Sequence, residues 1–427
     1  MDTQPVTFGG YFRLLRRNRN FRLLWYAQIV SELGDWLYAV SIYSMLLEYT
    51  GKAQSIALAF VLQVLPQFFV SPAAGILNDR VSRKKVMIFA DWMRAGIVFC
   101  MIFVRSPQAV PMLYVLLVAE TLMWALFEPG HNAVIPNITD ESEVVTANAL
   151  SSTTWSFTFA VGFALGGVLA AFFGRNAVFA LNAGSFVASA LLIGRMRFAE
   201  PHAAHLPPLQ WRDLFDFTPI REGIAYVWRD VRLRYTIFVK AGLGLMGANW
   251  VILPIFGERI FPVHLSGFSA RESGMLGMSL LMACRGIGAI VGPVAGGYWA
   301  GHREGRMRSG ILYGFLAAGA GYVLLGLAPN LPLACAALVL AHAGGSMLWV
   351  FSASLLQLQT EDRFRGRVFS AEFAFSVLTM SFSSYAAGLL VDWSMPVAQV
   401  AVLTGVVMIL PAAMWAVVLS RGKGRPD

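Results

Sequence analysis

The chain has 427 residues, of which 57% are hydrophobic and only 13% are charged. Soluble globular domains carry roughly 25% charged residues, so this composition excludes an ordinary soluble protein and makes lipid the solvent for much of the surface. The net charge of +9 does not indicate a nucleic-acid partner, because the basic residues are spread over short loops between apolar runs. The sequence predicts an all-α integral membrane protein.

Apolar stretches long enough to cross a bilayer recur along the whole chain. A span needs roughly 20 helical residues, and stretches such as 53–78 and 144–174 contain no Asp, Glu, Lys or Arg. The uncharged stretch 309–360 contains Pro329-Asn330-Leu331-Pro332, which predicts a tight turn since each Pro disfavours helix in the residue before it. The twelve predicted spans are 22–48, 55–77, 86–104, 110–130, 144–172, 176–195, 235–260, 272–300, 309–328, 331–357, 368–391 and 396–420.

The basic residues indicate which ends of the spans face the cytoplasm. If both termini lie on one side, that side holds 25 of the 33 Lys and Arg residues and the other side holds five. Cytoplasmic loops carry the excess of Lys and Arg in membrane proteins. We therefore expect both termini in the cytoplasm.

A charged, proline-rich segment divides the spans six and six. It predicts an N-terminal six-helix bundle at 1–195, a cytoplasmic linker at 196–234 and a C-terminal six-helix bundle at 235–427. Within the linker, residues 211–230 have an apolar and a charged side and are expected to form a surface helix. The two halves share weak similarity at the ends of spans 2 and 8, which either reflects a repeat or the chance recurrence of glycine-rich helix ends.

Motifs for several other function classes are missing from the sequence. It contains no Gly-x4-Gly-Lys-Ser/Thr nucleotide loop, and its His and Cys residues lack the spacing of metal ligands. We therefore expect no cofactor, no metal and no ATP. A membrane-embedded enzyme remains the alternative from a different class, but His131 and His342 stand without the partners that catalysis needs.

The segment Gly75–Lys85 reads Gly-Ile-Leu-Asn-Asp-Arg-Val-Ser-Arg-Lys-Lys. It closely resembles the Gly-x3-Asp-Arg-x2-Arg-Lys/Arg loop between spans 2 and 3 of the major facilitator superfamily. An ordinary positive-inside loop would account for the basic residues but not for Gly75 and Asp79 at this spacing. The resemblance implies a major facilitator fold, with twelve transmembrane helices in two six-helix bundles that rock about a central site.

Three further segments are similar to the drug:proton antiporter-3 branch, which includes enterobactin exporters and macrolide efflux proteins. They are Ser31–Trp36, Phe127–Gly130 with the residues that follow it, and Arg365–Val368. The resemblance covers essentially the whole chain. It implies a secondary active transporter in the cytoplasmic membrane of a bacterium, with a drug-like or siderophore-like amphiphile, protons and membrane lipid as its partners.

Proton-coupled export by alternating access is the expected mode, but two departures bear on it. Antiporters of this kind often carry an Arg in span 4 where this chain has Glu120, and the glycine pattern Gly162–Gly167 in span 5 lacks the usual Pro. The direction of transport is not written in the residues. An importer or facilitator of a nutrient or lipid is the alternative within the same class.

Carboxylates at membrane depth are the candidates for proton coupling. Ionisable groups there cost roughly 2.5–3.5 kcal/mol on insertion scales, so they normally face a cavity or a partner. Glu32 and Asp35 are three residues apart on one face of span 1, and two ionised carboxylates this close repel each other, which favours protonation of one. Asp35 is the first candidate, with Glu32 and Glu120 next, and structural pairing with a polar partner is the alternative.

Arg285 lies at mid-depth in span 8 and joins the candidate cavity residues. We expect it either to neutralise a carboxylate or to attract an anionic substrate. Lys240 is expected to extend its side chain to the membrane surface.

Other charged residues lie near the cytoplasmic ends of the spans and are expected to form a conformational gate. Asp91 and Arg94, three residues apart on span 3, are expected to form an ion pair within one helix. We expect the loop charges and two glutamates to latch the halves in the outward-open state. The residues assigned to this gate are Gly75, Asp79, Arg80, Arg83, Asp91, Arg94, Glu128 and Glu372.

Overall fold

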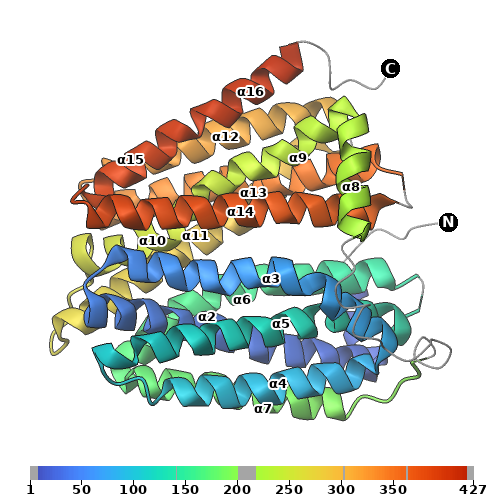
Figure 1. Ribbon diagram of the computed structural model, residues 1–427, viewed down its shortest axis with the longest axis horizontal. Helices are drawn as coiled ribbons and strands as arrows, with labels where there is room; N and C mark the ends of the chain where they lie inside the picture. The colour runs from blue at the N-terminus through green and yellow to red at the C-terminus, as the bar shows by residue number, and fades with distance from the viewer. Residues whose placement is uncertain (1–7, 141, 201–217, 302, 362–363, 421–427) are drawn as a thin grey trace. The chain divides into compact units, whose positions relative to one another are not determined.

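The computed structural model describes residues 8–140, 142–200, 218–301, 303–361 and 364–420, and the regular elements among them are all helices (Figure 1). The first seven are α1 Phe8–Arg17, α2 Arg19–Thr50, α3 Ala53–Arg80, α4 Arg83–Met101, α5 Val110–Ile138, α6 Val144–Phe173 and α7 Arg175–Gly194. The others are α8 Thr218–Arg229, α9 Val231–Gly244, α10 Asn249–Ile255, α11 Ala270–Ala300, α12 Glu304–Gly326, α13 Leu331–Gln359, α14 Arg365–Asp392, α15 Val397–Val407 and α16 Ile409–Ser420.

Ten of the described helical segments are long and apolar enough to cross a membrane. One of them, Val231–Ile260, joins α9 and α10 through short irregular turns, and another, Val397–Ser420, joins α15 and α16. The helices α2 and α4 have 32 and 19 residues but are not among the ten. Both carry charged residues within their length, such as Asp35 and Arg94, which lower their hydropathy. Ten candidate spans are thus found among the described residues, and the count of twelve stays a prediction.

Capping side chains set several helix ends. The turn predicted at 329–332 is confirmed, since α12 ends at Gly326 and α13 begins at Leu331. The Asn330 Oδ1 atom accepts a hydrogen bond of 3.1 Å from the backbone N–H of Leu333, which satisfies one of the free donors at the start of a helix. Ser82 caps α4 in the same way, with a bond of 3.2 Å from the Lys85 N–H.

Glycines allow the first and fifth spans of each half of the sequence to pack closely. A Cβ at Gly162 of α6 would lie 2.5 Å from the Cβ of Trp36 on α2, and one at Gly166 would lie 2.6 Å from the Leu37 carbonyl oxygen. Near the seventh span, a Cβ at Gly247 would lie 2.6 Å from the Met380 carbonyl oxygen of α14. Small residues at such crossings let helix backbones approach in membranes. The same pairing of spans therefore recurs in both halves, with the glycines on opposite partners.

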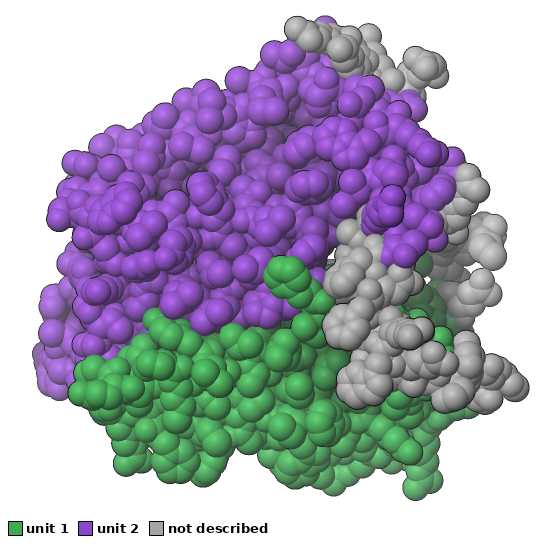
Figure 2. All heavy atoms as spheres, viewed as in Figure 1, with its two compact units in different colours: residues 1–42, 69–216 green, residues 43–68, 217–427 purple. Residues whose placement is uncertain are grey.

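The chain divides into two compact units (Figure 2). Unit 1 contains residues 1–42 and 69–216, and unit 2 contains residues 43–68 and 217–427. The end of α2 and the start of α3, residues 43–68, thus belong to unit 2, although they precede the predicted linker in the sequence. The division into bundles at 1–195 and 235–427 stays a prediction, and residues 201–217 of the linker lie outside the described residues.

Two shorter helices are amphipathic. In α1, Leu14 is buried in a core cluster of unit 1 while Phe12 is exposed. In α8, Val227 is buried beside Ile237 and Val368 in unit 2. The surface helix predicted at 211–230 therefore has its described counterpart in α8, whereas residues 211–217 are not described.

Candidate transport site

A buried cluster of charged side chains surrounds Arg94 of α4 in unit 1. The Arg94 side chain is only 2% exposed. Its Nη2 atom lies 2.6 Å from Oδ2 of Asp35 on α2, and its Nε atom lies 2.8 Å from Oε1 of Glu120 on α5. Its Nη1 atom is 3.7 Å from Oδ1 of Asp91 on its own helix. One guanidinium therefore ties three helices together.

The helix α7 completes the surroundings of this cluster. The Ser189 hydroxyl donates a 2.6 Å hydrogen bond to Oδ2 of Asp91. The ring of Phe186 lies 3.9 Å from the guanidinium carbon of Arg94, a distance at which a cation is attracted to an aromatic face. Full desolvation of a charge is costly unless it is paired, and here Arg94 is both paired and stacked.

The three carboxylates of the cluster differ in accessibility. The Asp35 side chain is 22% exposed, compared with 0% for Asp91 and 8% for Glu120. The second oxygen of Asp35, Oδ1, has no hydrogen-bond partner among the described residues. When all groups are ionised the cluster holds two more negative than positive charges. Asp35 is thus the carboxylate of the cluster with the most exposed side chain, although its Oδ1 atom is itself buried.

Glu32 lies one turn before Asp35 but has different partners. Its Oε2 atom accepts a 2.7 Å hydrogen bond from the Thr158 hydroxyl of α6, and its Oε1 atom accepts one of 2.9 Å from the Gln28 amide. Among the described residues, Glu32 forms no ion pair. It is therefore held by neutral donors, which stabilise a carboxylate less than a guanidinium does.

Sequence analysis assigned the members of this cluster to two different sites. It assigned Asp35 and Glu120 to proton coupling and Arg94 to the gate, with Asp91 as the expected partner of Arg94. The contacts of Arg94 with Asp35 and Glu120 are shorter than its contact with Asp91. The sequence placed Asp35 and Glu120 at similar depth and Arg94 near the cytoplasmic end of span 3, so the one signal that could have joined them is that a buried charge requires a partner.

The loop between α3 and α4 is bonded to its own unit. Arg83 donates a 3.0 Å hydrogen bond from Nη1 to the Ala133 carbonyl oxygen and lies 3.4 Å from Asp79. The Asp79 side chain is 66% exposed, and Arg80 is partly exposed. A Cβ added at Gly75 would meet no described heavy atom within 4 Å, so no helix among the described residues packs closely against this glycine.

The same loop also contacts the first residues after α7. The Lys84 ammonium donates hydrogen bonds of 2.9 and 2.6 Å to the carbonyl oxygens of Gly194 and Met196. The Glu200 carboxylate accepts hydrogen bonds from the Ser82 hydroxyl and the Lys84 N–H. Among the other predicted gate residues, Glu128 accepts a 3.1 Å hydrogen bond from the Asn132 amide one turn later on α5.

A second buried ion pair lies in unit 2. The Lys240 ammonium is 2.8 Å from Oε2 of Glu372, and both side chains are at most 5% exposed. The same ammonium lies 4.1 Å from the ring centre of Trp349. The expectation that Lys240 extends to the membrane surface is therefore wrong, because a carboxylate on the adjacent α14 and an aromatic face hold it inside. Glu372 is thus bonded within unit 2.

Arg285 of α11 has an aromatic environment in the same unit. Its guanidinium carbon lies 4.3 Å from the ring centre of Trp250, and Phe60 stacks on that ring at 4.9 Å. The phenols of Tyr43 and Tyr322 are near enough to interact with it electrostatically. The Tyr322 hydroxyl forms a 3.0 Å hydrogen bond with Nε2 of His342. The His342 ring also interacts electrostatically with Arg285. Groups able to donate hydrogen bonds therefore gather around a cation.

The outer end of the α2–α3 hairpin is bonded to other parts of unit 2. The Asp392 carboxylate at the end of α14 accepts hydrogen bonds of 2.8 and 3.0 Å from the first backbone N–H groups of α3, those of Ala53 and Gln54. Glu48 forms a 2.6 Å ion pair with Arg271. A Cβ at Gly388 would lie 2.8 Å from the Ala57 side chain. We name these contacts the hairpin latch. Sequence analysis did not predict it, because charged residues near helix ends are common and do not indicate their partners.

Comparisons with known proteins agree with this architecture. A family model for transmembrane secretion effectors of the major facilitator superfamily matches residues 13–422. The chain belongs to this family. The predicted superfamily is therefore confirmed, and the family is one of membrane transporters.

Several relatives are named as exporters or transporters. The uncharacterized MFS-type transporter YfiS of Bacillus subtilis is 27% identical, with 89% of this chain and 88% of that protein aligned. Macrolide efflux protein A of Streptococcus pyogenes is 30% identical over 40% of this chain and 42% of that protein. The putative bacilysin exporter BacE of Bacillus subtilis is 23% identical over 86% of this chain and 87% of that protein. The match to the MFS-type transporter YkuC spans 57% of its length.

Solved structures share the fold at low sequence identity. A peptide transporter POT in complex with alafosfalin has a TM-score of 0.75 at 13% identity, covering 99% of this chain and 97% of that one. The nucleoside transporter NupG has a TM-score of 0.72 at 13% identity, covering 92% and 99%. At this identity they show the fold alone, which is the predicted major facilitator fold.

Proposed function

We propose that this chain exports a small organic amphiphile across the cytoplasmic membrane in exchange for protons, by alternating access. The observation that carries the proposal is the Arg94 cluster, in which carboxylates outnumber cations and Asp35 is the most accessible of them. The exporters among the relatives support the outward direction. The distribution of basic residues supports cytoplasmic termini.

Proton binding to Asp35 would loosen α2 from the cluster. A neutral Asp35 loses its ion pair with Arg94, while Glu120 and Asp91 still neutralise that guanidinium. The remaining charges are then closer to balance, which lowers the electrostatic cost of holding them away from water. The helix that changes partners on protonation is therefore α2, and Glu32, one turn away, is a second place for the proton.

The helix α2 connects this event to the hairpin latch. Asp35 and Glu48 lie on one continuous helix, and at 1.5 Å per residue they are about 20 Å apart along it. Glu48 is paired with Arg271, and Asp392 caps the start of α3 directly after the hairpin turn. Opening the outer side would require these contacts to break. Loosening α2 at Asp35 favours that step.

The substrate side of the mechanism involves Arg285 and aromatic side chains. Arg285 lies on Trp250 with hydroxyl and imidazole groups nearby, an arrangement that suits the polar end of an amphiphile. In unit 1, the ring centre of Trp36 lies 4.6 Å from that of Phe159 and 5.7 Å from that of Trp155. Trp155 is half exposed. Aromatic faces of this kind give apolar contact that adapts to varied substrates.

The charged loop between α3 and α4 supplies the proposed cytoplasmic gate. Asp79 is exposed and only loosely paired with Arg83, so it is available for a different partner in another state of the cycle. We retain Arg80, Glu128 and Glu372 as members of this gate. The Asp79→Asn variant is expected to raise labelling of cysteines placed on the cytoplasmic side of the cavity.

Flux measurements in proteoliposomes test the proposed function. Vesicles are loaded with a panel of amphiphilic drugs and siderophores, and release is followed with and without an imposed pH gradient. We expect at least one compound to move faster with the gradient, and a protonophore to abolish the difference. Release at the same rate with and without the gradient would contradict proton coupling. Transport that occurs only as uptake would contradict the proposed direction of export.

A further inference from the structure

A small groove lies where the short helix α8 meets α9 and α14 in unit 2. Figure 1 shows α8 running across these two helices at one end of the unit. Among the described residues that line the groove, Arg234 is the one that carries a charge, and the others are apolar, including Trp228, Phe238 and Phe375. Its free volume of about 10 Å³ is roughly that of one water molecule. The groove can therefore seat part of a molecule along its surface but cannot enclose a solute.

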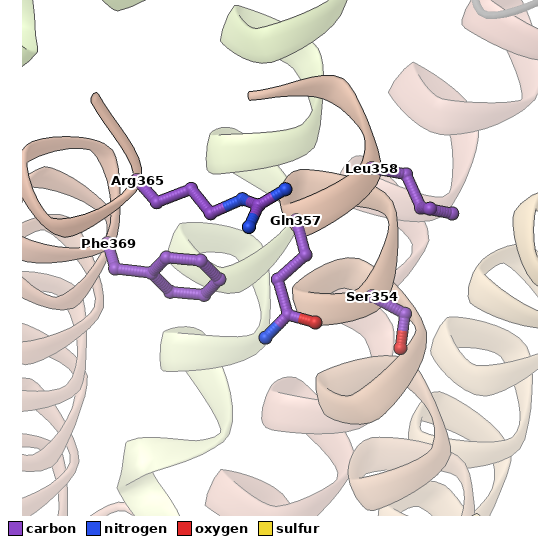
Figure 3. Close-up of a pocket in the computed structure, with 5 residues that line it drawn as sticks. All are labelled: Ser354, Gln357, Leu358, Arg365 and Phe369. Carbon is purple, nitrogen blue, oxygen red and sulfur yellow. The ribbon is translucent and has the colours of Figure 1, made fainter. Parts of the chain in front are cut away.

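The groove is separate from a cavity that α14 borders on another side. Arg365 and Phe369 of α14 line that cavity together with Gln357 of α13 (Figure 3). Ala371, which lines the groove, comes two residues after Phe369, and two residues turn a helix by about 200°. The helix α14 thus presents different faces to the two spaces, and the face toward α8 and α9 belongs to the groove.

Arg234 has no acidic partner among the described residues. Its side chain is partly buried, and its Nε atom is buried without a hydrogen bond. Its guanidinium carbon lies 5.8 Å from the ring centre of Trp228, close to the limit at which an aromatic face attracts a cation. Partial burial of a charge costs free energy that an anion would offset. Arg234 is therefore able to bind an anion that reaches the groove.

The carboxylates near this corner are already matched by other cations. Asp230 accepts a 2.7 Å hydrogen bond from the backbone N–H of Arg232 and lies 3.6 Å from its side-chain Nε. Glu222 of α8 is paired with Arg367 at 2.5 Å. Residues 218–240 contain five basic and two acidic residues, so the corner carries an excess of positive charge. Such an excess attracts the anionic lipids of a membrane surface.

The groove extends from the level of lipid head groups to the level of acyl chains. The helix α9 begins the candidate span Val231–Ile260. Arg234 and Phe238 come three and seven residues after its start, which places them about 5 and 10 Å along the helix. The Trp228 and Phe238 side chains are 54% and 41% exposed. Trp residues gather at the membrane–water interface, and an exposed ring deeper in the span meets acyl chains.

We propose that this corner binds one anionic phospholipid of the cytoplasmic leaflet, with its phosphate on Arg234 and an acyl chain along Trp228, Phe238 and Phe375. The Phe238 and Phe375 ring centres are 5.9 Å apart, so they form one apolar surface. A guanidinium binds phosphate through parallel hydrogen bonds. The distribution of basic residues places this end of α9 in the cytoplasm. The site holds a lipid whichever solute the chain transports.

Native mass spectrometry of the purified full chain in a non-ionic detergent measures this binding without transport. Phosphatidylglycerol is titrated into the protein, and the comparison ligands are phosphatidylcholine with the same acyl chains and free glycerol phosphate. We expect the first phosphatidylglycerol to bind more tightly than either. Bromine-labelled lipids locate it, because the fluorescence that is lost in Trp228→Phe should be quenched more by labelled phosphatidylglycerol than by labelled phosphatidylcholine.

Matched variants identify the residue that binds the phosphate. Arg234→Gln is expected to weaken binding of the first phosphatidylglycerol about tenfold, the effect of losing one hydrogen bond to a charged group. Arg232→Gln, the same change two residues earlier, should weaken it by less than about threefold, because an exposed ion pair contributes little. Arg234→Lys should keep most of the affinity, which would show that Arg234→Gln did not act through misfolding.

Three results would overturn the proposal. They are equal affinity in Arg234→Gln and Arg232→Gln, equal affinity for phosphatidylcholine and phosphatidylglycerol, and binding of glycerol phosphate as tight as that of the lipid. The last of these would mean that the site takes a free anion. Each leaves the proposed transport untouched, since flux is measured separately, and a protein without gradient-driven flux could still bind the lipid.

Discussion

Arg94 and Arg285 are the same kind of residue in similar helices, yet their surroundings are opposite. Arg94 of unit 1 contacts three carboxylates within 3.7 Å. Arg285 of unit 2 lies on the ring of Trp250 with phenols nearby. A cation among carboxylates leaves negative charge that a proton can neutralise, whereas a cation among hydrogen-bond donors suits an anion. Under the proposed function, this contrast assigns the proton to the Arg94 cluster of unit 1 and the polar end of the substrate to Arg285 of unit 2.

The largest effect is expected from removing the cation of unit 1. Arg94→Gln leaves three carboxylates buried together, and breaking a buried ion pair costs about 3–5 kcal/mol. We expect a strong loss of folded protein and of thermal stability in detergent. The double variant Arg94→Gln with Glu120→Gln should recover part of the loss. Thermal unfolding of the two variants side by side measures this, and an unchanged midpoint in Arg94→Gln would contradict the structural role of the cluster.

A smaller loss of stability is expected from replacing Lys240, which is paired with one carboxylate, that of Glu372. Lys240→Met leaves Glu372 buried without its cation and should lower stability, by up to the same 3–5 kcal/mol. Lys240→Met combined with Glu372→Met removes both charges and should return most of that stability. A double variant as unstable as the single one would show that the pair is not the main partner of either residue.

Arg285 is expected to matter more for transport than for folding. A cation on an aromatic ring contributes about 0.5–2 kcal/mol, so Arg285→Gln should change the unfolding midpoint less than Arg94→Gln does. Its KM for an anionic substrate should rise about tenfold, as expected for the loss of one charged hydrogen bond. Initial-rate flux against substrate concentration measures both constants. If stability fell as far as in Arg94→Gln while KM stayed constant, the contrast between the two arginines would fail.

The smallest effect is expected at the hairpin latch. Asp392→Ala removes the cap of α3, and losing such a cap costs about 0.5–2 kcal/mol. We expect a cysteine introduced by Ala57→Cys to react several-fold faster with an impermeant maleimide added from outside. Glu272→Ala is the control, because it removes a capping interaction from α11 without touching the start of α3. Equal rates in the two variants would mean that the Asp392 contacts do not hold the hairpin.

The sequence predicted the fold well because lipid imposes simple rules on it. The length of apolar stretches located the spans, and Asn330 with its flanking prolines marked a turn that the structure contains. The motif at Gly75–Lys85 identified the superfamily, which the family model matches over residues 13–422. These signals are local in the chain, so one sequence suffices to read them.

The partners of the charged residues were harder to predict because they are set by helix rotation. Asp35 and Glu120 were recognised as candidates, but their contact with Arg94 depends on which faces of α2, α4 and α5 meet. Lys240 was placed at the surface although Glu372, 132 residues later, holds it inside. Asp392 gave no signal at all, since nothing in a helix-ending aspartate indicates that it caps a distant helix.

The central claim, that Asp35 carries the exchanged proton, is tested most directly by comparing two modes of transport in one variant. Asp35→Asn keeps the side chain permanently neutral, and Asp140→Asn makes the same change at an exposed position of the same unit. We predict that Asp35→Asn still exchanges labelled for unlabelled substrate at equal pH but no longer responds to a pH gradient, whereas Asp140→Asn does both. Gradient-driven transport that persists in Asp35→Asn would contradict the account.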